Sequence, residues 1–470
     1  MSVTLKPYPE YKDSGVPWLG KIPQHWNINP GFSVFREKQH KNAGMVETTV
    51  LSLSYGRIVV KPTEKLHGLV PASFKTYQIV DPGEIIIRPT DLQNDWNSLR
   101  VGIARNRGII TSAYLCLRTI GPLVSDYGYL LLHTYDLMKI FYGMVSGLRQ
   151  NLDFTDLKRM PVMVPPREEQ GRIVAFLTHF DQRINYLIRT KRRLIELLNE
   201  QKQGTIHRAV TRGLYPNTRL KPSGIDWLGD VPEHWEIWQI GHFAKVGNGS
   251  TPSRGNTAYW SDHGYPWLNS SSVNQGVITK ADQFVTDLAL RECHLPHVRP
   301  GSVLVAITGQ GKTRGTAAVL AIEATINQHM TYISPKTVRV SSDYLQMYLT
   351  AAYVELRTIS DDSGSTKGAL TCEDVKHFKV ALPPSDEQDR LVCMVKQELA
   401  DIEITLTRIR REIDLLHEYR TRLIADVVTG QLDVRRVELP AMDEAEALTE
   451  WETDEDPEVD EMDAREGVDA

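Results

Sequence analysis

The sequence has little cysteine and no long apolar run. The four cysteines among 470 residues show no paired spacing, which argues against a disulfide framework and favours reduced thiols. They are Cys116, Cys293, Cys372 and Cys393. No stretch of about 18 apolar residues occurs, and residues 1–6 contain no apolar signal-peptide core. We therefore expect a cytoplasmic protein that does not contact the membrane.

Catalytic motifs are also missing. The sequence contains no GxGxxG after a predicted strand, no Asn- or Asp-Pro-Pro-aromatic motif of the amino-methyltransferases, and no convincing Asp…Glu-x-Lys cluster of a nuclease. Cys293-His294 with His297 are metal-ligand residue types, but no second ligand pair is near them in sequence. These absences predict a chain without catalytic residues and without a metal of its own.

Residues 306–313, Ala-Ile-Thr-Gly-Gln-Gly-Lys-Thr, nearly match a phosphate-binding P-loop, with Ala306 at the position of the first glycine. A P-loop must open a helix whose N-terminal amides hold the phosphates. Here Arg314 and Gly315 follow at once, and residues 316–320 suit a second strand at least as well. Nucleotide hydrolysis is the alternative; we favour a strand–turn–strand tip whose Lys312 and Arg314 could contact DNA.

Negative charge is concentrated at the end of the chain. Of 54 basic and 59 acidic residues, residues 441–470 hold 1 and 14, so residues 1–440 carry 53 and 45, a net charge of about +8. The tail is expected to be disordered and solvated. The basic remainder is compatible with nucleic-acid binding. For the tail, DNA mimicry, shielding of the basic surface and solubility all stay open.

One stretch occurs twice, at positions 218 residues apart. It begins with Pro-Pro-x-x-Glu-Gln at residues 165–170 and 383–388 and ends at residues 214 and 432. Apolar residues recur in both copies at steps of three and four, which is typical of a coiled coil. Each helix would be roughly 65 Å long at 1.5 Å per residue, and the pair would be antiparallel. Two unrelated amphipathic helices are the alternative. The predicted seam residues are Ile173, Leu177, Phe180, Ile184, Leu187, Leu194 and Leu198, with Leu399, Ile402, Leu406, Ile409, Ile413, Leu416 and Leu423.

The duplication extends beyond the helices. A tryptophan-rich lead-in at residues 14–26 recurs at 223–235, and we expect it to bury its tryptophans at a domain edge. Short β-branched runs at 85–87, 109–117 and 303–307 predict strands, and residues 127–142 and 343–358 predict helices. The fold class is α+β: two mixed domains alternate with the two long helices. The predicted boundaries are 1–164, 165–214 (first helix), 215–382, 383–435 (second helix) and 436–470 (acidic tail).

The repeated order of these motifs resembles the specificity (S) subunit of type I restriction–modification enzymes. The resemblance rests on the Trp-Leu-Gly and His-Trp pairs of the lead-in, the start of each long helix, and the helix ends at residues 209–214 and 427–432. It covers about residues 5–435 and leaves the acidic tail outside. One departure is Arg212, which stands where the second copy has Gly430.

The resemblance implies a DNA-reading subunit without chemistry of its own. Each α+β domain would be a target recognition domain for one half of a bipartite, asymmetric site in double-stranded DNA. The helices would set the gap between the halves and dock two methyltransferase (M) subunits, and motor–nuclease (R) subunits would join a complex with one copy of this chain. S-adenosylmethionine, ATP and Mg²⁺ would bind to those partners, which would methylate adenine or cut DNA. A coiled-coil scaffold that binds only proteins is the other alternative.

Reading of base edges needs arginine, lysine, asparagine or glutamine side chains. Arg149 and Lys367 occupy matching positions in polar loops of the two copies. For each candidate, a solvated surface residue or a strand-edge hydrogen bond is the alternative. The candidates are Arg88, Asn94, Arg105, Arg107, Arg149 and Gln150 in the first domain, and Arg254, Asn269, Lys312, Arg314, Asn327, Gln328 and Lys367 in the second.

Overall fold

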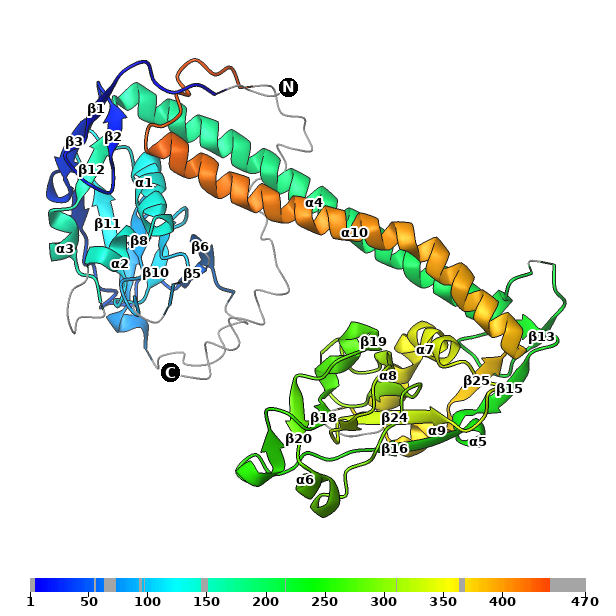
Figure 1. Cartoon of the computed structure of the whole chain (residues 1–470). Helices are drawn as coiled ribbons and strands as arrows, with labels where there is room; N and C mark the ends of the chain where they lie inside the picture. The colour runs from blue at the N-terminus through cyan, green and yellow to red at the C-terminus, as the bar shows by residue number, and fades with distance from the viewer. Residues whose placement is uncertain are drawn as a thin grey trace. The chain divides into compact units, whose positions relative to one another are not determined.

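A computed structural model describes residues 5–439 of the chain, apart from 55, 63–72, 93–94, 97, 145–150, 216, 310 and 363–367. Two long helices, α4 (Arg167–Arg212) and α10 (Ser385–Val428), connect two α+β domains (Figure 1). The chain forms two compact units, of which unit 1 comprises Met1–Arg192 with Arg411–Ala470 and unit 2 comprises Arg193–Arg410. This division passes through both long helices, because part of each helix packs with each domain.

The core of unit 1 is an antiparallel four-stranded sheet in the order β4-β11-β8-β9. Its strands are β4 (Phe35–Glu37), β11 (Leu115–Thr119), β8 (Ile85–Ile87) and β9 (Val101–Ile103), and α1 (Ser125–Leu137) packs on one face. The inner strand β8 has a buried isoleucine at each of its three positions, so both faces of the sheet are covered there. The other elements are β1 (Tyr11–Asp13), β2 (Lys21–Pro23), β3 (Asn27–Pro30), η1 (Gly31–Ser33), β5 (Leu51–Ser54), β6 (Arg57–Val60), η3 (Phe74–Thr76), β7 (Gln78–Val80), β10 (Gly108–Ile110), α2 (Ile140–Met144), α3 (Phe154–Lys158) and β12 (Pro161–Val164).

Unit 2 is built around a five-stranded sheet in the order β16-β24-β21-β22-β19. Its strands are β16 (Ala244–Asn248), β24 (Met330–Pro335), β21 (Val303–Ala306), β22 (Ala317–Leu320) and β19 (Val277–Ile278), and α7 (Ser342–Ala351) packs against β21 and β22. A second sheet has the order β17-β20-β18-β23. The other elements are β13 (Leu220–Pro222), β14 (Asp230–Pro232), β15 (Glu236–Gln239), α5 (Ile240–Phe243), η4 (Thr257–Tyr259), β17 (Trp260–Ser261), β18 (Tyr265–Leu268), η5 (Ser270–Gln275), β20 (Gln283–Val285), α6 (Asp287–Glu292), β23 (Thr325–Ile326), α8 (Tyr353–Asp362), α9 (Cys372–His377) and β25 (Lys379–Leu382).

Two predicted elements of unit 1 are interrupted. The predicted strand 109–117 is split into β10 and β11, because Thr111 forms a turn in which its Oγ1 accepts from Ala113 N at 3.3 Å. The predicted helix 127–142 ends at Leu137 and resumes as α2, because Lys139 adopts a positive φ of 59°. In unit 2 the predicted helix 343–358 is likewise divided into α7 and α8.

In unit 1 the first turn of α4 holds the lead-in segment through a buried glutamate. Glu169 accepts hydrogen bonds from Trp26 Nε1 at 2.9 Å and Tyr8 OH at 2.6 Å. It also pairs with His25 Nε2 at 2.7 Å. Burial and the hydrogen bond to Glu169 raise the pKa of Tyr8 well above its ordinary value. The predicted burial of the lead-in tryptophan is confirmed at Trp26, which is fully buried.

Unit 2 repeats this contact at the start of α10. Glu387 accepts from Trp235 Nε1 at 3.2 Å and pairs with His234 Nε2 at 2.7 Å. The next residue of each helix makes a second matched set of bonds. Gln170 accepts from Val124 N at 2.8 Å, and Gln388 accepts from Ser341 N at 2.8 Å. The recurring Glu-Gln pair therefore ties each long helix to its domain.

The C-terminal end of each long helix packs on the lead-in of the other copy. Gly430 follows α10 with a φ of 76°, and a Cβ there would lie 2.5 Å from Pro23 Cδ. Gly213 follows α4 with a φ of 69°, and a Cβ there would lie 3.0 Å from Trp235 Cζ2. Glycine suits this helix-ending conformation. The departure at Arg212 is thus a shift by one residue, because α4 continues to Arg212 and the glycine follows it.

The long helices pair antiparallel, as predicted. In both units, ion pairs join the two helices. From pair to pair, the residue number rises along α4 and falls along α10, which is the order expected of antiparallel helices. The pairs are Asp181–Arg420 and Lys191–Glu412 in unit 1, and Lys202–Glu403 and Arg208–Glu398 in unit 2. Among the described residues, no helix is long and apolar enough to cross a membrane.

The seam of α4 differs from the predicted one at two positions. Leu187 and Leu194 are each 43% exposed, whereas Ile188 is 3% exposed and Ile195 is half-buried. Two successive four-residue steps, from Phe180 to Ile184 and on to Ile188, shift the inner face by one residue. Such a stutter locally unwinds a coiled coil. The other predicted seam residues of both helices are buried or half-buried.

We expect His133 of α1 to make unit 1 less stable at acidic pH. Its Nδ1 is buried and has no hydrogen-bond partner among the described residues. Burial, with a smaller effect of Arg420, lowers the pKa of His133 to about 4, against about 6.5 in an unfolded chain. The unfolded state therefore takes up the proton first, and stability present above pH 6.5 is lost as pH falls to 4. Since the ring is partly accessible, the loss should be at most about 3 kcal/mol.

Calorimetric unfolding of wild type and His133→Leu between pH 7 and 4 measures this contribution. The variant should lose less stability over that interval than wild type. Equal losses in the two proteins would show that another group causes the acid sensitivity.

Candidate nucleic-acid interface

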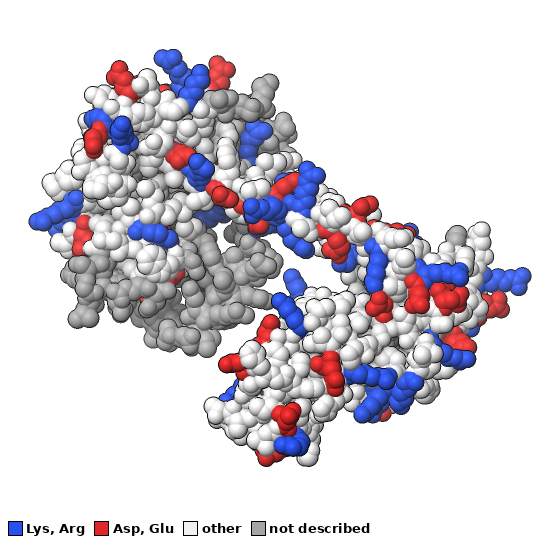
Figure 2. Space-filling view, viewed as in Figure 1, with Lys and Arg blue, Asp and Glu red and all other residues white. Residues whose placement is uncertain are grey.

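Charge alone does not mark a binding surface. Basic and acidic side chains are interspersed over the face of the described residues in Figure 2. Several predicted contacts also lie beside carboxylates. The pairing of a basic residue with a carboxylate weakens its attraction to phosphate, so the candidate interface must be located from loop geometry as well as from charge.

Two equivalent hairpin loops stand at the same position in the two domains. Loop 1, residues 88–100, joins β8 to β9, and loop 2, residues 307–316, joins β21 to β22. Both strand pairs are antiparallel. The strand–turn–strand tip predicted at the P-loop-like stretch is confirmed, because Lys312 is followed by β22 and not by a helix.

The base of each loop is held by a short segment of the same domain, which precedes α3 in unit 1 and α9 in unit 2. Leu152 N donates to Pro89 O at 2.9 Å in unit 1, and Leu370 N donates to Ile307 O at 2.9 Å in unit 2. The two donors are 218 residues apart in the sequence, and so are the two acceptors, so the two loops share one tertiary setting. Thr308 also forms a β-bridge with Ala369. Asn94, Arg149, Gln150 and Lys367, which were predicted as contacts, lie outside the described residues.

The described candidates of unit 1 are all next to acidic side chains. Arg88 Nη1 lies 3.9 Å from Asp95 Oδ2 in loop 1. Arg105 and Arg107 follow β9, where Arg105 Nη1 pairs with Asp126 Oδ1 at 2.6 Å. Arg107 is about half exposed, and its pairing with an acidic side chain is described next.

Arg107 belongs to an ion network with Lys38, Asp81 and Glu84. Arg107 Nη1 lies 2.9 Å from Asp81 Oδ1, and Lys38 Nζ lies 2.8 Å from both carboxylates. The hydrogen bond from Lys38, followed by the nearby positive charges, lowers the pKa of Asp81. The network holds the guanidinium of Arg107 in place and also neutralises part of its charge.

In unit 2 the guanidinium of Arg254 lies against two tryptophan rings. Its Cζ lies 3.8 Å from the ring centre of Trp260 and 5.0 Å from that of Trp267. Its Nη2 donates to Gln283 Oε1 at 2.8 Å. Asn269, in contrast, caps η5 by accepting from a backbone amide, so its side-chain oxygen has a local structural role.

A line of polar side chains lies beside loop 2. Thr251 Oγ1 donates to Gln328 Oε1 at 2.6 Å, Gln328 Nε2 lies 3.1 Å from His329 Nε2, and His329 Nδ1 lies 2.7 Å from Thr308 Oγ1. Gln328 is exposed, whereas its predicted neighbour Asn327 is only 5% exposed. Thr251 and His329 were not among the predicted contacts, because only the fold brings them to Gln328.

The two predicted contacts in loop 2, Lys312 and Arg314, differ in exposure. Lys312 is exposed. Arg314 is only 4% exposed and pairs with Asp361 Oδ1 at 2.7 Å, so in this structure it does not present its guanidinium at the surface. A one-dimensional pattern could not distinguish them, because both are basic residues two positions apart in a glycine-rich turn.

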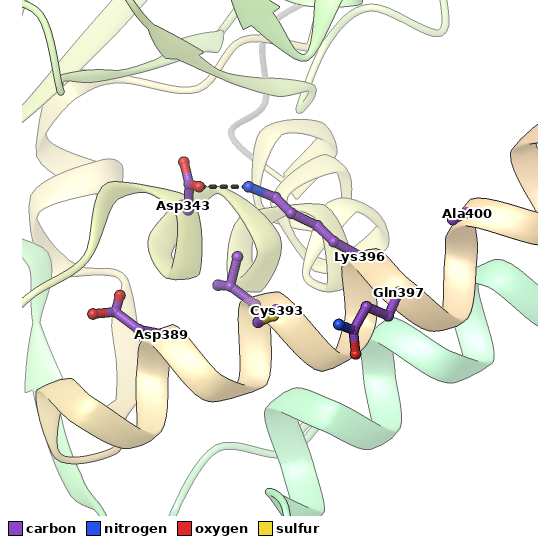
Figure 3. Close-up of a pocket in the computed structure, with 7 residues that line it drawn as sticks. Asp343, Asp389, Cys393, Lys396, Gln397 and Ala400 are labelled. Carbon is purple, nitrogen blue, oxygen red and sulfur yellow. Dashed lines mark hydrogen bonds and ion pairs between the residues drawn. The ribbon is translucent and has the colours of Figure 1, made fainter.

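A shallow depression of about 440 Å³ lies between the start of α7 and the outer face of α10 (Figure 3). Lys396 Nζ pairs there with Asp343 Oδ2 at 2.6 Å, next to the exposed Cys393. The first copy has Thr178 and Ala175 at the positions of Lys396 and Cys393, so the feature is not duplicated. It contains none of the predicted base-reading residues.

Metal-ligand residue types do not gather in the part of the chain that the structure describes. No group of three or more His, Cys, Asp or Glu there could hold an ion. His297, considered as a zinc ligand above, instead lies 3.1 Å from Tyr265 OH through Nδ1.

Comparison with known proteins identifies similar chains. Residues 112–197 and 232–414 match the family model described as type I restriction modification DNA specificity domain. The chain is 21% identical over 430 residues to the type I restriction enzyme MjaVIII specificity subunit of Methanocaldococcus jannaschii, covering 89% of this chain and 95% of that protein. It is 21% identical over 348 residues to the MjaIX specificity subunit of the same organism, covering 72% and 76%.

A solved chain from work on complex assembly and conformational transition of the type I R-M system has a similar fold. Its TM-score is 0.64 at 15% identity, over 87% of this chain and 99% of that chain.

Proposed function

Because the chain belongs to the family of type I restriction–modification DNA specificity domains, we propose that it reads a bipartite, asymmetric target in double-stranded DNA. The observation that carries this proposal is the duplicated site: two domains of divergent sequence present the equivalent loops 1 and 2. Each domain is tied to a long helix by the same Glu-Gln contact. Each domain would read one half-site. The antiparallel helices would set the gap between the halves.

We further propose that the chain performs no chemistry itself. Two M subunits would methylate adenine with S-adenosylmethionine, and R subunits would use ATP and Mg²⁺ to cut unmodified DNA. One copy of this chain would direct them in the cytoplasm. The family membership supports these assignments, since its members are specificity subunits.

The long helices offer surfaces for the proposed M subunits. Leu187, Leu194 and Leu197 of α4 are 43–45% exposed, and Leu415 and Tyr419 of α10 are 45% and 50% exposed. Apolar side chains repeated on a solvent-facing helix are typical of protein-binding surfaces. A duplicated chain can present two similar surfaces to two identical partners.

Sequencing of methylated bases tests the proposal. DNA from cells that hold this chain with its methyltransferase partner is compared with DNA from a deletion strain. A split motif with a fixed gap that vanishes on deletion is the expected result. An unsplit motif would refute the two-domain arrangement, and unchanged methylation would favour the coiled-coil scaffold.

Lys312→Ala is expected to weaken DNA binding about 2- to 10-fold and to reduce the slope of log affinity against log salt by about 1, because one exposed cation of loop 2 is lost. Lys336→Ala is the matched control. Lys336 is also exposed, but it follows the last residue of β24, whereas loop 2 lies beside the first residue of that strand. Nucleotide binding should be the same in wild type and variant. Unaltered DNA affinity would remove Lys312 from the interface, whereas loss of nucleotide affinity would revive the P-loop alternative.

A further inference from the structure

Loop 1 is held from inside by an arginine that is 0% exposed. The guanidinium of Arg100 donates to the carbonyl oxygens of Asp91 at 3.0 Å and Asp95 at 2.7 Å, and also to that of Thr90. Arg100 N donates to Asp136 Oδ2 at 2.6 Å. A buried arginine is rare unless its donors are paired, and here they bind the backbone of the loop that the arginine ends.

A tyrosine on α2 completes this arrangement. Tyr142 OH accepts from Arg100 Nε at 3.1 Å and donates to Asp95 O at 2.9 Å. The ring of Tyr142 also stacks on that of Trp96, at a centroid distance of 4.5 Å and an interplanar angle of 23°. Trp96 is nevertheless 54% exposed. The described contacts of loop 1 therefore hold Trp96 against Tyr142 while leaving much of the indole exposed, and an exposed aromatic ring is the type that stacks on nucleobases.

Loop 2 contains a corresponding arginine. Arg314 is 4% exposed and reaches Asp361 of α8, as Arg100 reaches Tyr142 of α2. Gly368 closes over the ion pair: a Cβ at this position would overlap the Arg314 guanidinium and lie 2.6 Å from Asp361 Oδ1. The exposed Lys312 is then displayed by a loop whose end is fixed.

The two arginines are not aligned in sequence. Arg100 corresponds to Ala318 at the 218-residue offset, and Arg314 corresponds to Trp96. Each domain thus has a buried arginine near the end of its equivalent hairpin loop, but the two arginines stand at different positions of the repeat. The brace therefore recurs although the two loops differ in length, 13 residues in loop 1 and 10 in loop 2.

We propose that Arg100 and Arg314 are positioning residues, each of which holds one hairpin loop in its DNA-reading conformation and so governs the specificity of one half-site. The inference rests on the proposed function. It predicts that weakening one brace relaxes one half-site and leaves the other half-site and the gap unchanged.

The brace of loop 2 is tested with Asp361→Asn and Gly368→Ala in the full chain with its methyltransferase partner. The Asp361 side chain is 60% exposed, so its replacement should leave the fold intact. Glu355→Gln is the matched control, because it removes one negative charge from the same helix, α8. Sequencing of methylated bases should show roughly 5- to 100-fold weaker discrimination at one or more positions of a single half-site, the range for loss of one base contact.

The brace of loop 1 is tested with Tyr142→Phe, which removes the hydroxyl but keeps the ring against Trp96. Tyr77→Phe is the control, in a tyrosine that meets Phe74 edge to face outside loop 1. Relaxation should now affect the opposite half-site. Thermal unfolding of every variant verifies that it is folded at the temperature of the methylation assay.

The outcomes separate this inference from the proposed function. A split wild-type motif whose halves keep full discrimination in Asp361→Asn, Gly368→Ala and Tyr142→Phe would overturn the positioning role. An equal loss at both half-sites would also overturn it, because the arginines would then support the fold in general. An unsplit wild-type motif would instead refute the proposed function, on which the inference rests.

Discussion

Replacing Glu169 by alanine should destabilise unit 1 by about 3–5 kcal/mol, because one buried carboxylate serves three donors at the start of α4. Trp26 Nε1, Tyr8 OH and His25 Nε2 lie 2.6–2.9 Å from its oxygens. The variant would leave the indole and the phenol buried without their acceptor. At a few degrees per kcal/mol, the melting temperature of unit 1 should fall by roughly 10 °C.

Glu387→Ala provides the matched comparison in unit 2. Glu387 has two of the three donors, Trp235 and His234, so its loss should cost less. Differential scanning calorimetry of the full chain, with each unit followed as its own transition, measures both changes. Equal, small shifts below 1 kcal/mol would show that the glutamates contribute charge at the helix start and do not hold the lead-in.

Adding seven residues to both long helices should reduce methylation of the native site at least tenfold. Insertions after Lys191 in α4 and before Glu412 in α10 keep this ion pair, at 2.5 Å, on one side of the added turns. Two turns add about 10.5 Å, which corresponds to about three base pairs. Three base pairs rotate DNA by about 100°, whereas a heptad ends only about 20° from two full turns, so the half-sites would no longer face both loops.

Residual methylation is the more informative result. It should report both original half-sites with a gap longer by about three base pairs. A heptad placed in the α4 helix alone would leave seven residues without a partner in α10, and should perturb the spacing or abolish assembly. Full methylation at the original gap in either variant would rule out the role of the helices in setting that gap.

The sequence by itself determined the architecture because the relevant signals are local or periodic. The 218-residue offset identified the duplication, and steps of three and four residues predicted both long helices. Family membership followed from motifs at the helix starts and lead-ins. The strand at Ile85–Ile87 and the hairpin at Lys312 were also predictable, since β-branched runs bounded by glycine or proline have few alternatives.

Only the tertiary structure decided the roles of individual polar residues. Lys312 and Arg314 have the same charge two positions apart, yet one is exposed and the other is buried against Asp361. Arg100 and Tyr142 were not predicted at all, because their partners are backbone carbonyls and a residue 42 positions away. Side-chain burial and long-range hydrogen bonds depend on how segments pack, and periodicity carries no information about them.

The seam of α4 shows the same limit within a regular helix. Leu187 and Ile188 are both apolar, so sequence alone allows either one to face α10. The choice depends on the accumulated rotation of α4 from the contact at Glu169 onward, and two successive steps of four place Ile188 inside. A pattern of apolar residues therefore determined that the helices pair, whereas their packing determined which residues form the seam.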